Sequence, residues 1–129
     1  MKKAYKVYQI DSFSDKKFLG NPAGVVYNAD GSKEYDVHWR FFTPLKEVPI
    51  CGHSTIAAHY VIALENNLKE KTCIRQKTGA GILPVEIEPL GNSYNIVMTQ
   101  GKVEFGNIIE GNDLGRLVSA LGIDNNDLI

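Results

Sequence analysis

The residues best suited to chemistry form a short run from Cys51 to Ser54, directly before a long apolar stretch. Within four positions the chain places a thiol, an imidazole and a hydroxyl, and Gly52 allows a ligand to approach the backbone closely. The stretch that follows has helical character, so the unpaired N–H groups of its first turn should point at whatever lies in front of them. This pattern predicts a binding site for an anionic ligand, such as a small carboxylate.

His53 is the candidate catalytic residue, because an imidazole can donate to or accept from a bound carboxylate near neutral pH. Gly52, His53 and Ser54 are candidate substrate-binding residues through their backbone N–H groups, although a plain cap by Ser54 or Thr55 needs the same residue types. Cys51 is either an acidified thiol at a helix start or a packed free cysteine. Three histidines and scattered acids share no ligand spacing, so neither a metal nor a cofactor is expected.

These residues are positioned by a helix that is apolar nearly all round. From Ile56 to Leu64 only His59 and the Tyr60 hydroxyl are polar, whereas a surface helix carries a charged face. The helix is therefore predicted to be buried, with His59 as a hydrogen-bonded core residue. His38, by contrast, alternates on a strand and should be exposed.

The rest of the chain reads as short strands that must hide one apolar face each. The predicted strands cover residues 5–10, 23–27, 35–42, 72–77, 82–88 and 94–99. A turn is predicted at 28–32, and a short helix should start at Asn112 or Asp113 and stop at Gly122. The pattern predicts one α+β domain over residues 1–129, with a rolled, mostly antiparallel sheet wrapped around the central helix.

Composition excludes several classes of partner. With a formal net charge of -1 the chain has no basic excess for nucleic acid or a membrane surface. No apolar run is long enough to span a bilayer, and the N-terminus leads into a strand pattern, so a cytoplasmic location is expected. Cys51 and Cys73 are then read as reduced thiols.

Three motifs resemble the phenazine-biosynthesis PhzF-like family of isomerases, which shares its fold with diaminopimelate epimerase. They are QIDSF at 9–13 followed by GNPAGVV at 20–26, FTP at 42–44 with EV at 47–48, and CGHSTIAA at 51–58. The resemblance implies two similar halves, each a rolled sheet around a helix, with the active site between them. It also implies cofactor-independent proton transfer by a glutamate, with His53 helping to hold the substrate and Asn21 lining the cleft.

The chain departs from the family pattern in two ways. In the family, a helix and a strand with the catalytic glutamate precede the FTP strand, but here only residues 28–36 fill that interval, and the second half is absent. Glu47 or Cys51 could replace the glutamate, since epimerase relatives use a cysteine at a comparable helix start. Two functions remain: an isomerase impaired as this chain alone, or a non-catalytic small-molecule-binding or scaffold domain. A homodimer or a missing second half is the expected partner.

Overall fold

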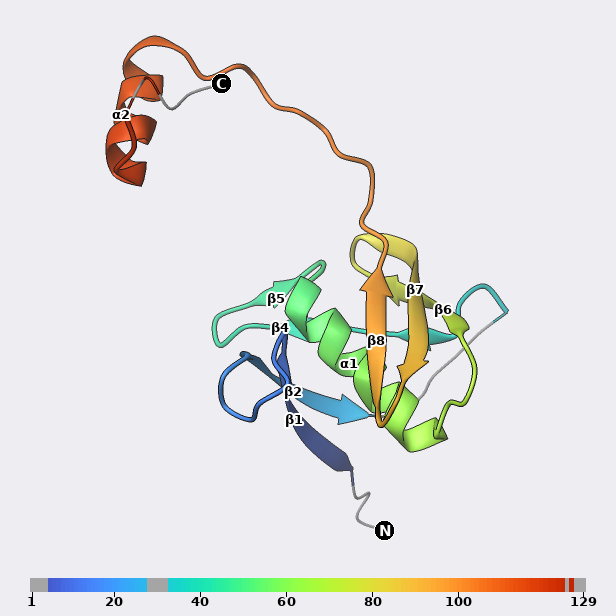
Figure 1. Ribbon diagram of the computed structural model, residues 1–129. Helices are drawn as coiled ribbons and strands as arrows, with labels where there is room; N and C mark the ends of the chain where they lie inside the picture. Colours follow the sequence, from blue (N-terminus) through green and yellow to red (C-terminus); the bar gives the residue numbers. More distant parts are fainter. Residues whose placement is uncertain (1–4, 28–32, 125, 127–129) are drawn as a thin grey trace.

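The computed structural model describes residues 5–27, 33–124 and 126 (Figure 1), and the turn predicted at 28–32 lies outside them. The elements, in chain order, are β1 (Lys6–Ser12), β2 (Asn21–Tyr27), β3 (Val37–His38), β4 (Phe41–Phe42), β5 (Glu47–Val48), α1 (Gly52–Asn66), β6 (Thr72–Thr78), β7 (Gly81–Leu90), β8 (Ser93–Met98) and α2 (Gly111–Leu121). Every predicted strand region and both predicted helices are present.

The strands form three sheets, with the orders β1-β2, β3-β6-β7-β8 and β4-β5. β3 runs parallel to β6, and the other described pairs are antiparallel. This confirms the predicted α+β class and the meander over β6, β7 and β8. The single strand predicted at 35–42 is instead split in two. β3 pairs with β6, and the chain then turns so that β4 pairs with β5. The alternation over these eight residues gave no sign of the break.

α1 is the centre of the fold because it packs against two sheets on different faces (Figure 1). Toward β2, three small residues of α1 meet two of the strand: Ala57, Ala58, Val61, Ala23 and Val25. Toward β3, β6 and β7, the contacting residues are Ile62, Ala63, Val37, Ile74 and Ile87. Burial on both faces explains why the helix needs no charged stripe, and it confirms the predicted central helix.

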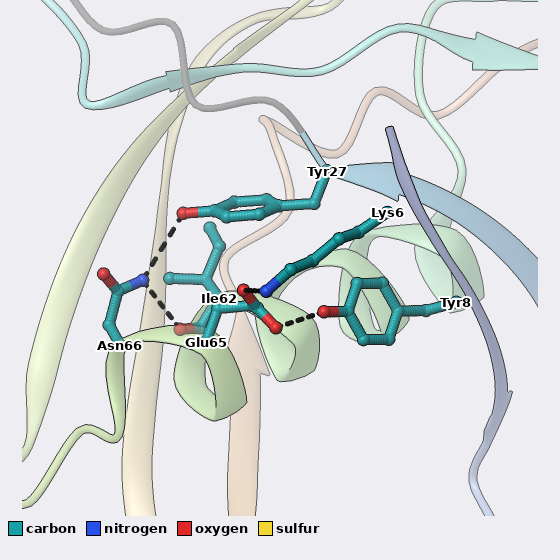
Figure 2. A network of polar contacts seen from close by, with 6 residues as sticks. All are labelled: Lys6, Tyr8, Tyr27, Ile62, Glu65 and Asn66. Atoms are coloured by element: carbon teal, nitrogen blue, oxygen red, sulfur yellow. Dashed lines mark hydrogen bonds and ion pairs between the residues drawn. The ribbon is translucent and has the colours of Figure 1, made fainter. Parts of the chain in front are cut away.

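The C-terminal end of α1 is fixed to β1 and β2 by polar contacts, which Figure 2 shows. The Lys6 ammonium donates to Glu65 Oε2 at 2.6 Å, and the Tyr8 hydroxyl donates to Glu65 Oε1. The Asn66 amide donates to the Tyr27 hydroxyl at 3.4 Å and to the Ile62 carbonyl at 2.9 Å. These contacts hold the helix axis against the β1-β2 sheet.

α2 lies away from the body formed by α1 and the strands, at the end of a stretch over 99–110 with no regular structure (Figure 1). Glu110 is its N-cap residue, so the predicted start at Asn112 or Asp113 was late, while the predicted stop at Gly122 is confirmed by a left-handed φ of 66°. In the part of the chain that the structure describes, neither helix is both long and apolar enough to cross a bilayer.

Candidate functional site

The first turn of α1 leaves its backbone donors without a capping side chain. Cys51 is the N-cap residue, with extended φ and ψ of -148° and 113°, and its carbonyl accepts the Thr55 N–H at 2.9 Å. The N–H groups of Gly52, His53 and Ser54 precede that bond and have no partner within the helix. The alternative of a cap by Ser54 or Thr55 is therefore wrong: both lie inside the helix, one turn too late to cap it. The first turn also holds no acidic residue.

A thiol and an imidazole meet at this helix start. Cys51 Sγ lies 3.4 Å from His53 Nδ1, and both side chains are partly buried. A thiol beside an imidazole can pass a proton between sulfur and nitrogen, which is the arrangement used to activate cysteine in acid–base and nucleophilic chemistry.

Ser12, the last residue of β1, holds the helix start in place. Its hydroxyl donates to the His53 carbonyl at 2.7 Å, and its side chain is only 3% exposed. Sequence reasoning read the segment around Ser12 as the end of a strand and as part of the QIDSF motif, and it gave Ser12 itself no role. A small polar residue closing an alternating run was the available signal, but its partner lies 41 residues away and only the fold brings them together.

Asn21 is connected to the start of α1 by Ser12, which pairs with Asn21 and bonds to His53. The two residues face each other in the β1-β2 ladder, and Asn21 is exposed. The tight return of the chain depends on Gly20, because a Cβ there would lie 2.5 Å from the Ser12 carbonyl oxygen. The structure therefore gathers Asn21 and His53 around one serine.

Two cavities flank the first two turns of α1. Ser54 and Ala58 line one of about 360 Å³, together with parts of β2, β3 and β4. Ser12 and Ile56 line a larger one of about 650 Å³, with residues 9–17 and 93–96. None of the four predicted site residues lines the larger cavity, whereas Ser54 lines the smaller one.

The Glu47 carboxylate is paired with Arg40. Its two carboxylate oxygens accept Arg40 Nε at 3.0 Å and Arg40 Nη2 at 2.8 Å. The hydrogen bonds from Arg40 lower the pKa of the Glu47 carboxyl from its ordinary value. A carboxylate that is already paired and less basic is poorly suited to replace an acid–base glutamate.

His59 is buried, as predicted, and stays outside the site. Its Nδ1 carries the proton that it donates to the Thr55 carbonyl at 2.9 Å, while burial lowers the imidazole pKa to about 4. His38 is exposed, as predicted. Cys73 is exposed, and both cysteines are free thiols. Within the described ranges, no three His, Cys, Asp or Glu side chains form a possible metal-binding group.

The fold defines an α+β protein in which strands surround a central buried helix. Residues 31–108 match the PhzC-PhzF family model, described as phenazine biosynthesis-like protein. The chain belongs to this family, which confirms the resemblance read from the three motifs.

Relatives similar to this chain are named as isomerases. An uncharacterized isomerase of Clostridium acetobutylicum is 47% identical over 154 positions, covering 100% of this chain and 51% of that protein. The uncharacterized isomerase YddE of Escherichia coli is 36% identical over 147 positions, covering 96% of this chain and 49% of the relative. The chain thus spans about half the length of the curated relatives it matches.

A solved structure shows the same fold. The crystal structure of a PhzF-family phenazine biosynthesis protein from Bacillus anthracis superposes with a TM-score of 0.73 and 31% identity. The match covers 95% of this chain and 48% of the other.

The alignment with the Clostridium relative also reveals missing positions. It runs over 154 positions although this chain has 129 residues, so at least 25 positions of the relative face no residue here. The relative therefore has more positions than this chain within the aligned region.

Proposed function

We propose that this chain carries the substrate-binding helix start of a PhzF-type isomerase and that it is impaired in catalysis as this chain alone. The observation that carries the proposal is the first turn of α1, where three uncapped N–H groups stand beside the Cys51–His53 contact. The substrate class is a small molecule with a carboxylate.

In this proposal the carboxylate accepts hydrogen bonds from the N–H groups of Gly52, His53 and Ser54. A helix N-terminus contributes about 0.3 to 1 kcal/mol toward an anion, so binding to this turn alone is weak and salt-sensitive. The exposed Asn21 side chain, held near Ser12, supplies a further polar contact at the rim. Ser12 is a positioning residue, because it fixes the peptide of His53 from the side away from the ligand.

The reaction is a proton transfer that needs no cofactor. A base removes a proton from a carbon of the substrate, and an acid returns a proton to another position, so the product is an isomer and no electrons leave the substrate. The Cys51 thiol and the His53 imidazole, 3.4 Å apart, are the groups of this chain able to hold that proton.

Impairment is proposed because a positioned acid or base is worth about 10² to 10⁴ in rate. The Clostridium acetobutylicum relative has at least 25 positions that this chain lacks, and the Glu47 carboxylate is hydrogen-bonded to Arg40. We expect no deuterium uptake from solvent into small carboxylate substrates above a buffer blank. Uptake that is lost in Cys51→Ser but kept in Cys73→Ser would show that the Cys51–His53 pair suffices, and would overturn the impairment.

Binding is tested separately by amide chemical shifts during titration with acetate and then sulfate. Shifts should cluster at residues 52–54, weaken with added chloride and shrink in His53→Ala. Chemical shift changes clustered elsewhere, or unchanged in His53→Ala, would contradict a binding site at the start of α1.

The second candidate, a binding domain without catalysis, is favoured by the missing positions. The two functions predict different results when the unmatched half of the Clostridium acetobutylicum relative is added as a separate chain. An isomerase half should then gain deuterium exchange that depends on His53, whereas a binding domain should stay inactive.

A further inference from the structure

Five buried polar side-chain atoms between α1 and β6 have no hydrogen-bond partner among the described residues. They are Trp39 Nε1, Thr55 Oγ1, His59 Nε2, Gln76 Nε2 and Gln76 Oε1. Thr55, His59 and Gln76 are each 0% exposed, and the indole nitrogen is buried although Trp39 as a whole is partly exposed. Burying a polar atom without a partner is costly and rare in native proteins, so each of these atoms calls for a partner.

Thr55 and His59 lie on the face of α1 that packs against β6. Residues four apart share one face of a helix, and the next residue in this series, Ala63, shares a core cluster with Ile74 of β6. His59 Nδ1 donates to the Thr55 carbonyl at 2.9 Å, so Nε2 is the acceptor of this ring that is left over.

Gln76 faces the same part of α1. The buried residues of β6 alternate along the strand and therefore point to one side: Ile74, Gln76 and Thr78. Ile74 packs with Ile62 of α1, whereas Gly79, directly after β6, lies so close to Pro49 that an added Cβ would be 2.8 Å from the Pro49 Cα. Two strand residues span about 6.6 Å and one helical turn about 5.4 Å, so Gln76 lies about one turn nearer the start of α1 than Ile62. That is the level of the unpartnered imidazole.

Trp39 brings the remaining group to the same place. Its ring meets the His59 imidazole in a T-shaped contact, with 6.3 Å between the ring centroids. Its backbone N–H donates to the Lys77 carbonyl at 2.9 Å, next to Gln76 in β6. Trp39, Thr55, His59 and Gln76 thus form one buried group, which we call the core polar cluster.

The core polar cluster offers both donors and acceptors but no charge. The indole N–H of Trp39 only donates, the neutral His59 Nε2 only accepts, and the Thr55 hydroxyl and the Gln76 amide do both. The imidazole is neutral at pH 7, because burial lowers its pKa to about 4. An anion would be repelled by the imidazole acceptor and a metal cation by the indole N–H, whereas water can accept from one and donate to the other.

We propose that the core polar cluster binds internal water, with at least one molecule that accepts a hydrogen bond from Trp39 Nε1 and donates one to His59 Nε2. Thr55 Oγ1 and the Gln76 amide supply further bonds, and a buried water typically makes about three. Such a water ties the second turn of α1 to β6 and to the residues between β3 and β4. The inference rests on the core polar cluster and does not depend on the proposed function.

Trp39 is the single tryptophan of the chain, so its indole proton gives one assignable signal in the full-length protein. Water-selective NOE and ROE spectra of a ¹⁵N-labelled sample should show a cross-peak from water to this proton, with the NOE sign of a long-lived internal water. Absence of the cross-peak would overturn the inference. A scalar coupling between Trp39 Nε1 and His59 Nε2 would also overturn it, because it would show a direct hydrogen bond between the rings.

Thr55→Val tests whether the signal comes from water itself. The Thr55 hydroxyl proton exchanges with solvent and could relay the same cross-peak, and valine removes that proton at nearly constant shape. The cross-peak should persist in Thr55→Val, since Trp39, His59 and Gln76 remain as partners. Its loss would assign the signal to the hydroxyl and would contradict bound water.

Gln76→Leu gives an effect whose sign separates a hydrated cluster from a dry one. If the amide bonds to water, the variant leaves that water short of partners, and the unfolding equilibrium constant should rise about tenfold. If the amide is unpartnered in a dry core, the same change removes buried polar atoms and should stabilise the protein, which would overturn the inference. Gln9→Leu at an exposed position of β1 is the matched control and should change stability little.

The spectra of the parent chain and of Thr55→Val decide the question even if Gln76→Leu does not fold. All of these measurements are made without substrate or acetate. Failure of the proposed function therefore leaves them unaffected, and failure of the water site leaves the donors of the first turn as they are.

Discussion

The first turn of α1 has no capping side chain, whereas carbonyl groups of its last turn accept hydrogen bonds from the residues that end the helix. At the N-terminal end, Gly52, His53 and Ser54 offer N–H groups outward. At the C-terminal end, Asn67 adopts a left-handed conformation and its N–H returns to the Leu64 carbonyl at 3.3 Å.

The side chains around the two ends differ in the same way. Glu65 holds Lys6 and Tyr8 of β1, and Asn66 reaches Tyr27 of β2, as Figure 2 shows. Among the described residues, Ser12 of β1 reaches the N-terminal end with a hydrogen bond, and that bond goes to the His53 carbonyl and not to a backbone N–H group. One end of the helix is joined to the neighbouring strands by side chains, and the other keeps uncapped backbone donors.

The largest expected effect is a change in unfolding free energy with pH, and it arises from His59 in the middle of α1, between the two ends compared above. His59 is neutral when folded, with a pKa lowered from 6.5 to about 4, mainly by burial. A depressed folded pKa means that the unfolded chain binds the proton more tightly, so stability is full above pH 6.5 and falls as the pH drops toward 4. The loss in unfolding free energy should approach about 3 kcal/mol.

Chemical denaturation from pH 8 to 4 measures this loss. His38→Gln removes an exposed histidine and should leave the pH curve unchanged. A flat unfolding free energy across this range would show that His59 is charged or solvated in the folded protein, and the central part of α1 would then not be the rigid element that separates the two ends.

The second prediction concerns a substitution that adds a capping side chain to the first turn of α1. Cys51→Ser places a hydroxyl at the N-cap, where its backbone is already extended, and it should accept the Ser54 N–H. We expect unfolding free energy to rise by about 1 kcal/mol and acetate binding to weaken, since one donor is now occupied. Thermal unfolding and acetate titration check this, with Cys73→Ser on β6 as control. A destabilised Cys51→Ser protein would show that the packing of the thiol outweighs the new cap.

The third prediction separates stability from binding at one residue. A Cβ added at Gly52 meets no atom within 4 Å, so Gly52→Ala should fold normally and gain about 0.4 to 1 kcal/mol from a stiffer unfolded chain. The methyl group should nevertheless obstruct an anion approaching the helix start. Gly115→Ala in α2 has equally open surroundings and should leave acetate binding unchanged. Equal acetate affinity in Gly52→Ala and the parent would remove the first turn of α1 from the site.

The smallest effect is expected at the closed end. Hydrogen bonds from Lys6 and then Tyr8 lower the pKa of the Glu65 carboxyl, so their contribution is present above its ordinary value of 4.5 and is lost as the pH falls below it. Glu65→Gln should lower the melting temperature slightly at pH 7 and low salt, because exposed pairs contribute little. The difference should vanish at acidic pH and at high salt. A difference that persists under both conditions would mean that Glu65 acts through packing.

Much of the fold followed from local patterns. The apolar run from Ile56 to Leu64 predicted a buried central helix, and alternation predicted the meander over β6 to β8, because both depend on periodicity within one segment. The family followed from three motifs in order. The split of residues 35–42 into β3 and β4 was not predictable, since it depends on β6 and β5 offering separate edges to one short stretch.

For the site, the sequence by itself determined which residue types stand at the start of α1, since Cys51, Gly52 and His53 are consecutive. Tertiary structure decided what each can do. It joined Ser12 to His53 across 41 residues, and it paired Glu47 with Arg40, whose hydrogen bonds lower the pKa of the Glu47 carboxyl. It also left the N–H groups of the first turn without a cap. Hydrogen bonds between distant segments depend on how strands and helices pack, and no local pattern encodes that packing.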